Sequence, residues 1–152
     1  MINFINKNII IATITSVVII LLLSACGEDI CKKVEESETV VIVTAVDLIK
    51  EYNDNVDVAD KKYKQAVLAV TGIIGEIEIE EDEYGYINIT LLGEEPLEPI
   101  TKVPVFRVIC YFSPDKKDVL AQLELEQEVT VTGLGDGLLV HPVLLGCQVI
   151  KK

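Results

Sequence analysis

Hydrophobic residues follow three different patterns along this chain of 152 residues. Residues 9–23 are almost continuously apolar, residues 41–52 carry apolar side chains at helical spacing, and much of residues 67–150 alternates between apolar and polar positions. These patterns are typical of a membrane-directed segment, an amphipathic helix and half-buried β-strands. We therefore predict an N-terminal targeting segment followed by one mainly β domain.

The helical pattern begins near residue 39 and forms one apolar stripe along the helix. Its members are Val41, Ala45, Leu48, Ile49 and Tyr52. A second short helical turn is predicted at residues 59–64, with Asp57 and Asp60 as candidate capping residues. The apolar stripe has to pack on another element, which we expect to be the β domain.

Strands are predicted at residues 67–80, 86–92, 105–112, 128–133 and 143–150. Acidic residues 80–85 connect the first two strands as a hairpin, and glycine-rich residues 133–137 form a second turn. Ser113 and Pro114 begin a short helix that ends near Leu123.

One face of each strand is predicted to point inward. The inward positions are Thr71, Ile73, Gly75, Ile77 and Ile79, then Ile87, Ile89 and Leu91, then Phe106, Val108, Cys110 and Phe112.

Three strands, one helix and two strands follow each other in the order of the OB-fold, a five-stranded Greek-key barrel. We predict this mainly β fold, with an N-terminal helix before it and a short helix between strands 3 and 4. Gly72 and Gly75 suit a long first strand that must bend to pair at both ends. A β-sandwich is the alternative arrangement of the same strands.

The apolar run ends in Leu23-Ser24-Ala25-Cys26, and Gly27 separates this motif from the acidic residues Glu28 and Asp29. As a helix, its fifteen residues would rise about 22 Å, less than the roughly 30 Å hydrocarbon core of a bilayer. The motif resembles the lipobox of bacterial lipoproteins. This resemblance implies cleavage before Cys26, diacylglycerol on its thiol, and a fatty acid such as palmitate on its new amino group. An uncleaved membrane anchor is the alternative.

These features divide the chain into a lipoprotein signal peptide (1–25), a lipidated flexible tether (26–38) and an OB-fold domain (39–152). The predicted location is the cell membrane or outer membrane, with the domain facing the periplasm or the exterior. Thirteen basic and 25 acidic residues give a net charge of -12, and removing residues 1–25 takes away only Lys7. An acidic protein of this kind is a poor match for nucleic acid or an anionic lipid surface.

Six segments in a fixed order resemble one protein family. They are DLIKEYNDN, ADKKYK, LAVTGII, VICYF, EVTVTG and GCQVI, spread over about residues 43–150. Together they are similar to the tRNA-anticodon-binding-like (tRNA_anti-like) OB-fold proteins, which are secreted or lipid-anchored in bacteria. The resemblance implies an OB barrel with an N-terminal helix and carries over no catalytic residue. The family is named for its fold, so the name does not imply tRNA binding.

Cys110 and Cys147 are predicted on the inward faces of strands 3 and 5, which are neighbours in an OB barrel. A disulfide between them would close a 38-residue loop and stabilise the exported protein by about 4 kcal/mol. The alternatives are two buried thiols that pack as small hydrophobic groups, or a redox or metal pair. Cys31 falls in the tether, where we expect a mobile cysteine that is unpaired or in a mixed disulfide. Pairing of its thiol with another chain is the alternative.

Tyr86, Arg107 and Tyr111 form the candidate ligand face on the barrel exterior, because OB-folds bind oligomers by stacking on aromatic side chains. Ordinary surface packing is the alternative. The acidic residues 76–83 alternate along a strand and are interpreted as a solvated face and not a calcium site. His141 precedes a proline, which favours a role in a turn. We therefore predict no metal, no cofactor and no enzymatic activity.

The predicted function is a lipid-anchored, extracytoplasmic binding module of the cell envelope. Its partners would be the membrane, through Cys26, and an envelope protein, peptide or glycan. The alternative is binding of single-stranded nucleic acid or an oligosaccharide through the same OB-fold face.

Overall fold

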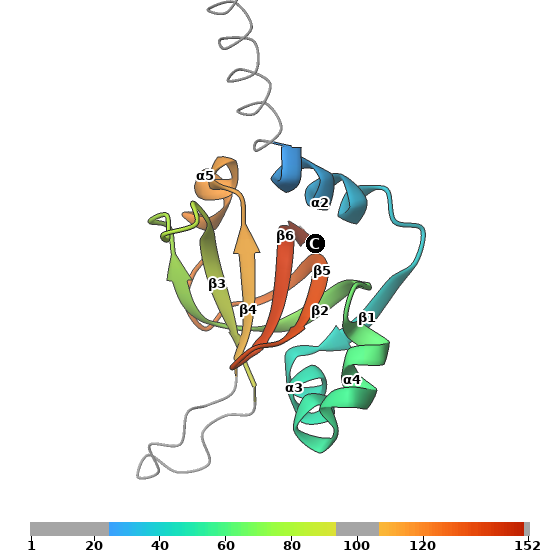
Figure 1. Ribbon diagram of the computed structural model, residues 1–152. Coiled ribbons are helices and arrows are strands. Elements are labelled where there is room, and N and C mark those ends of the chain that lie inside the picture. Colours follow the sequence, from blue (N-terminus) through green and yellow to red (C-terminus); the bar gives the residue numbers. More distant parts are fainter. Residues whose placement is uncertain (1–24, 94–106, 151–152) are drawn as a thin grey trace, which may run out of the picture.

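The computed structural model describes residues 25–93 and 107–150 (Figure 1). Its elements in chain order are α2 (Ala25–Glu35), β1 (Val40–Thr44), α3 (Ala45–Asp54), α4 (Val56–Tyr63), β2 (Val67–Glu78), β3 (Ile87–Leu92), β4 (Arg107–Phe112), η1 (Pro114–Lys116), α5 (Lys117–Leu120), β5 (Glu128–Leu138) and β6 (Pro142–Ile150). The predicted signal peptide, except for Ala25, and the predicted core residue Phe106 lie outside the described residues.

In the described part of the chain, six strands form one sheet in the order β1-β2-β3-β4-β6-β5. The first half of β2 also pairs with β5, and this pairing closes the five strands after β1 into a barrel. β4 and β6 pair in parallel, and η1 and α5 connect β4 to β5. This is the predicted OB-fold, and the closed barrel excludes the β-sandwich alternative. Figure 1 shows α2 and α5 at one end of the barrel and α3 and α4 at the other.

The barrel core is built from alternate residues of each strand. Ile87, Ile89 and Leu91 of β3 are fully buried, as the alternating pattern predicts. On β4, Val108, Cys110 and Phe112 are buried as well. The inward faces of these two strands are therefore confirmed for the described residues.

In β2 the predicted inward face is wrong up to and including Gly75, which is exposed. Ile73 is 40% exposed, whereas its neighbour Ile74 is fully buried. The pairing of β2 with β3 shifts register between Ile74 and Glu76, so one extra residue reverses the alternation there. After this bulge the odd positions do face inward, and Ile77 packs against the core.

The predicted N-terminal helix is present as α3, but it begins later than predicted. The preceding β-branched residues of β1 form a strand parallel to β2, and Thr44 ends it by accepting a hydrogen bond from the Asp47 N–H (3.0 Å). The apolar stripe of α3 is buried. A Cβ on Gly72 would lie 2.8 Å from the Ala45 Cβ, so Gly72 permits close packing of α3 on β2.

Two smaller expectations also differ from the structure. Asn55, and neither predicted aspartate, caps α4 by accepting a hydrogen bond from the Val58 N–H (3.2 Å). The glycine-rich residues 133–137 lie inside β5, and the chain turns at residues 139–141. Glycine is needed there for space, because a Cβ on Gly135 would overlap the Tyr63 carbonyl oxygen.

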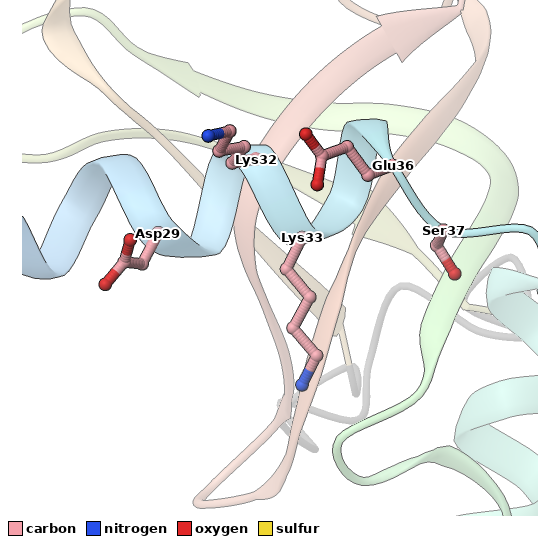
Figure 2. A pocket seen from close by; sticks show the side chains of 5 residues that line it. All are labelled: Asp29, Lys32, Lys33, Glu36 and Ser37. Atoms are coloured by element: carbon pink, nitrogen blue, oxygen red, sulfur yellow. The ribbon is translucent and has the colours of Figure 1, made fainter.

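The segment predicted as a flexible tether contains the helix α2. Its inner side carries Ile30 and Val34, which pack against Val67 and Leu134 of the barrel. Figure 2 shows the opposite side, where an open hollow of about 440 Å³ is lined by Asp29, Lys32, Lys33, Glu36 and Ser37. Ile30 and Val34 are two apolar residues four positions apart in a segment with many charges. Two residues are too few to give a clear helical pattern in the sequence.

Candidate ligand-binding face

A groove of about 250 Å³ crosses the outer face of β2, β3 and β4. The residues that line it are Glu76, Glu78, Asn88, Thr90, Arg107, Ile109, Tyr111 and His141. Seven of these belong to the three strands, whose inward residues are fixed in the core, so the barrel holds the floor of the groove in place. The groove contains two of the three predicted ligand-face residues.

The register of the sheet arranges the groove residues in rows. Glu78 lies opposite Asn88, and Asn88 lies opposite Tyr111. The next row consists of Glu76, Thr90 and Ile109. Adjacent strands are about 4.8 Å apart, so each row presents three different side chains across roughly 10 Å.

A hydrogen bond within the first row joins two of its side chains. The Asn88 side-chain amide donates to Glu78 Oε2 at 2.7 Å, and Asn88 is only 7% exposed. This contact holds the Glu78 carboxylate over the groove floor. Hydrogen bonds to a charged acceptor are among the stronger ones in proteins, so the position of Glu78 is well defined.

An ion pair crosses the groove above β3. Arg107 Nη1 of β4 donates to Glu76 Oε2 of β2 at 2.7 Å, and both side chains are nearly half exposed. Exposed ion pairs of this kind contribute only about 0–1 kcal/mol, so the pair can open at little cost. Once the pair opens, the Arg107 guanidinium is available as a donor and the Glu76 carboxylate as an acceptor.

Tyr86 and Tyr111 form an aromatic corner at one end of the face. Their ring centroids are 6.1 Å apart with an interplanar angle of 63°, which is an edge-to-face arrangement. Burial, followed by the nearby Asp82 and Glu78 carboxylates, raises the pKa of the Tyr111 hydroxyl. The hydroxyl therefore remains protonated near neutral pH and can donate a hydrogen bond.

The loop between β2 and β3 positions Tyr86. Asp82 Oδ1 accepts hydrogen bonds from the Tyr84 and Tyr86 N–H groups, both at 2.9 Å. Gly85 has a φ of 79°, which favours glycine and lets the chain reverse. The acidic hairpin is therefore an ordered turn that places the tyrosine beside β4.

The structure places all three predicted residues on the same outer face, with Arg107 four residues from Tyr111 along β4. Reasoning from the sequence missed Asn88 and Thr90. A signal for them was present, because both occupy the outward positions between Ile87, Ile89 and Leu91. The approach of Arg107 to Glu76, 31 residues away in sequence, has no local signal.

Thr90 has an unusual environment at the floor of the groove. It is 5% exposed, and its Oγ1 has no hydrogen-bond partner among the residues that the structure describes. A buried hydroxyl without a partner costs about 1–3 kcal/mol of stability. His141 lies at the rim, where its Nδ1 accepts a long 3.5 Å contact from the Arg107 N–H.

The predicted cysteine pair lies away from this face, in the barrel core. Cys110 and Cys147 are fully buried on β4 and β6, and Cys31, Cys110 and Cys147 are free thiols in the described structure. Burial, followed by a hydrogen bond with the Cys110 thiol, raises the pKa of the Cys147 thiol well above its usual range. The two thiols are close enough to share a hydrogen bond, and a disulfide between them stays a prediction.

The backbone of Cys26 lies in the first turn of α2. Residues 25–93 and 107–150 contain no helix that is long and apolar enough to cross a membrane. Over the same residues, no three His, Cys, Asp or Glu side chains gather into a potential metal-ion site. In particular, the carboxylates of residues 76–83 do not converge.

Closed topology and an outer groove over β2, β3 and β4 define this chain as an OB-fold protein with a candidate binding face. A family model described as tRNA_anti-like matches residues 1–149. The chain therefore belongs to the tRNA_anti-like family, in agreement with the resemblance in its sequence.

A solved structure with a similar fold is that of a candidate nucleic acid-binding lipoprotein from Klebsiella pneumoniae subsp. pneumoniae MGH 78578. The TM-score is 0.57 at 17% sequence identity, and the similarity covers 72% of this chain and 92% of the other. At this identity the similarity supports the shared fold alone. None of the curated protein sequences matches this chain.

Proposed function

We propose that the chain is a lipid-anchored binding module of the bacterial cell envelope, which presents the β2-β3-β4 face to an envelope partner. The observation that carries this proposal is the groove itself, with an aromatic corner at one end and a weak ion pair across it. Such a set of donors, acceptors and an aromatic wall on a rigid barrel suits recognition of a ligand. The proposed role is binding and not catalysis, since the chain has a single histidine and no Gly-x-Ser-x-Gly motif.

Photo-crosslinking in intact membranes tests the face. A benzophenone amino acid replaces Tyr86 or Tyr111 in the full chain, and a matched variant carries it at Val58 on α4, which is 58% exposed. We expect the same partner to be captured from positions 86 and 111 but not from 58. Equal capture from all three positions, or none from 86 and 111, would contradict the proposed face.

Anchoring through Cys26 is the second part of the proposal. The Leu-Ser-Ala-Cys motif supports it, because the motif resembles the lipobox of bacterial lipoproteins. Diacylglycerol and a further fatty acid on Cys26 would supply the two or more acyl chains that stable attachment to a bilayer needs. Metabolic labelling with an alkyne-tagged fatty acid should label the wild-type chain and Cys31→Ser, but not Cys26→Ser. Detection of label in Cys26→Ser, or of an intact N-terminus with a free Cys26 thiol in the wild type, would refute the anchor.

Single-stranded nucleic acid or an oligosaccharide is the second candidate ligand. The OB-fold favours this candidate, and the Klebsiella protein with the similar fold is described as a candidate nucleic acid-binding lipoprotein. The charge of the face disfavours nucleic acid, because the carboxylates of Glu76 and Glu78 outnumber the Arg107 guanidinium in the groove. A mobility shift of oligothymidine at low salt would support this alternative, and the absence of a shift would exclude it for that ligand.

A further inference from the structure

The groove has an unbalanced negative charge. Two carboxylates and one guanidinium line it, and the guanidinium of Arg107 pairs with Glu76. Glu78 accepts its hydrogen bond from the neutral amide of Asn88, so among the described residues no ion pair neutralises its charge. The adjoining hairpin adds four more acidic residues at positions 80–83. A cleft lined by charge of one sign attracts ligands of the opposite sign.

The aromatic corner is suited to a positive group as well. Tyr86 and Tyr111 lie side by side, and Tyr111 is in the same cross-strand row as Glu78. An ammonium group near a tyrosine ring is stabilised by the ring electrons, with the largest effect at sites shielded from water. A cation placed between Glu78 and Tyr111 would therefore meet a carboxylate on one side and a ring on the other.

Thr90 supplies an observation that is independent of charge. It lines the groove beside Glu76, and its buried Oγ1 is without a partner in the described structure. The Arg107–Glu76 pair spans β3 at this position and can open at little cost. An incoming N–H donor would then satisfy the Thr90 oxygen, while the freed Glu76 carboxylate would add a second acceptor.

We infer that the groove binds the protonated side-chain amine of a lysine, carried on an extended basic segment of a protein partner. This inference rests on the proposed face and specifies what the face recognises. The ammonium group lies against the Tyr111 ring and donates hydrogen bonds to Glu78 and Thr90. Complementary charge brings the segment to the acidic hairpin, and the groove orders one lysine side chain.

The test measures binding of a lysine-serine octapeptide to the full chain in nonionic detergent, by calorimetry at low salt. Acetylation of the lysine amines should weaken binding at least tenfold, and 0.3 M salt should weaken it as well, because the attraction is ionic. Equal affinity for the acetylated and unmodified peptides would overturn the inference.

Matched variants locate the binding site. Glu78→Gln removes the charge but keeps an oxygen that accepts from Asn88, and should weaken peptide binding several-fold. Glu36→Gln makes the same change at an exposed position directly after α2 and should leave the affinity unchanged. If both variants weaken binding equally, the peptide responds to net charge alone and the inference fails.

Thr90→Val separates a binding role from a structural one. Removing an unpartnered buried hydroxyl should raise the melting temperature of the free protein, and in our proposal it also weakens peptide binding several-fold. A more stable variant with unchanged affinity would contradict the assigned role of Thr90.

Other ligands distinguish failure of this inference from failure of the proposed face. Binding of a neutral chitotetraose or of oligothymidine that is lost in Tyr111→Leu, without binding of the lysine peptide, would retain the face and reject the lysine. Absence of peptide binding also rejects the lysine, and crosslinking from positions 86 and 111 then decides independently whether the face is used.

Discussion

Ile30 of α2 rests directly on Gly146 of β6. A Cβ on Gly146 would lie 2.7 Å from Ile30 Cγ2, and Gly146 has a φ of 62°. The helix whose first turn contains the proposed lipid site therefore packs against the barrel at a position that only glycine fills without strain. A hydrogen bond from the Gln148 side chain to Glu35 (2.8 Å) holds the other end of this helix.

Gly146→Ala should therefore release α2 from the barrel. We expect a loss of about 1–2 kcal/mol in the free energy of unfolding from the positive φ, and a further loss from the steric overlap with Ile30. Trypsin should cleave after Lys32 and Lys33 faster than in the wild type. Urea unfolding and timed proteolysis measure the two effects.

Gly85→Ala is the matched control, because its φ is also positive (79°) while the nearest atom to a Cβ would be 3.8 Å away. It should lose stability without faster cleavage in α2. Equal cleavage rates in Gly146→Ala and the wild type would show that α2 does not depend on this contact.

Local alternation was sufficient to predict β3 and β4, because every second residue of each strand enters the core. It failed in β2, where the register shift beside Gly75 exchanges the two faces. The shift arises from pairing with a strand distant in sequence, so no local pattern reveals it. In the same way, a glycine-rich segment was predicted as a turn, although its glycines give neighbouring atoms room within β5.

The candidate face was predictable to a similar extent. Side chains alternate between the two faces of a strand, so Arg107 and Tyr111, four residues apart on β4, lie on the same face. This depends only on local geometry. The groove depends on which strands are neighbours and in what register, which brings Glu76 beside Thr90 and Arg107 across β3. The unpartnered hydroxyl of Thr90 is a property of the packed structure and has no counterpart in sequence.

Tyr52 should make the stability of the protein depend on alkaline pH. It is 3% exposed and its hydroxyl donates to Asp60 Oδ1 at 3.1 Å. Burial, followed by this hydrogen bond, raises the pKa of Tyr52 above its usual value of about 10. A raised pKa in the folded state means that the stabilisation is complete below about pH 10 and is lost as the pH rises toward the folded-state pKa.

Tyr52→Phe tests this linkage by urea unfolding between pH 8 and 11. The variant should lose about 1 kcal/mol at pH 8, because the hydrogen bond to Asp60 is absent. Above about pH 10 the free energy of unfolding should fall less steeply with pH in the variant than in the wild type. The two slopes should differ by up to about 1.4 kcal/mol per pH unit, the value for one proton. Tyr84→Phe, at a site that is 76% exposed, should keep the wild-type slope. Parallel slopes for Tyr52→Phe and the wild type would contradict the linkage.

Cys110 and Cys147 should form a disulfide when the chain is exported, and they should do so before the barrel closes. The raised pKa of Cys147, caused first by burial, keeps its thiol protonated in the folded state, and only the thiolate attacks an oxidant. The folded, reduced chain should therefore resist iodoacetamide at these two positions until it is unfolded. Cys31, which is only partly buried, should react first although burial also raises its pKa.

Mass analysis of the native protein without reductant measures the outcome directly. We expect a mass about two units lower than that of the reduced chain, and a peptide that joins Cys110 to Cys147. Closing the loop should stabilise the oxidised form by about 4 kcal/mol, and Cys31→Ser should leave this gain unchanged. If both core thiols of exported protein are alkylated after unfolding without reductant, the bond is absent and the pair packs in the core as two hydrophobic thiols.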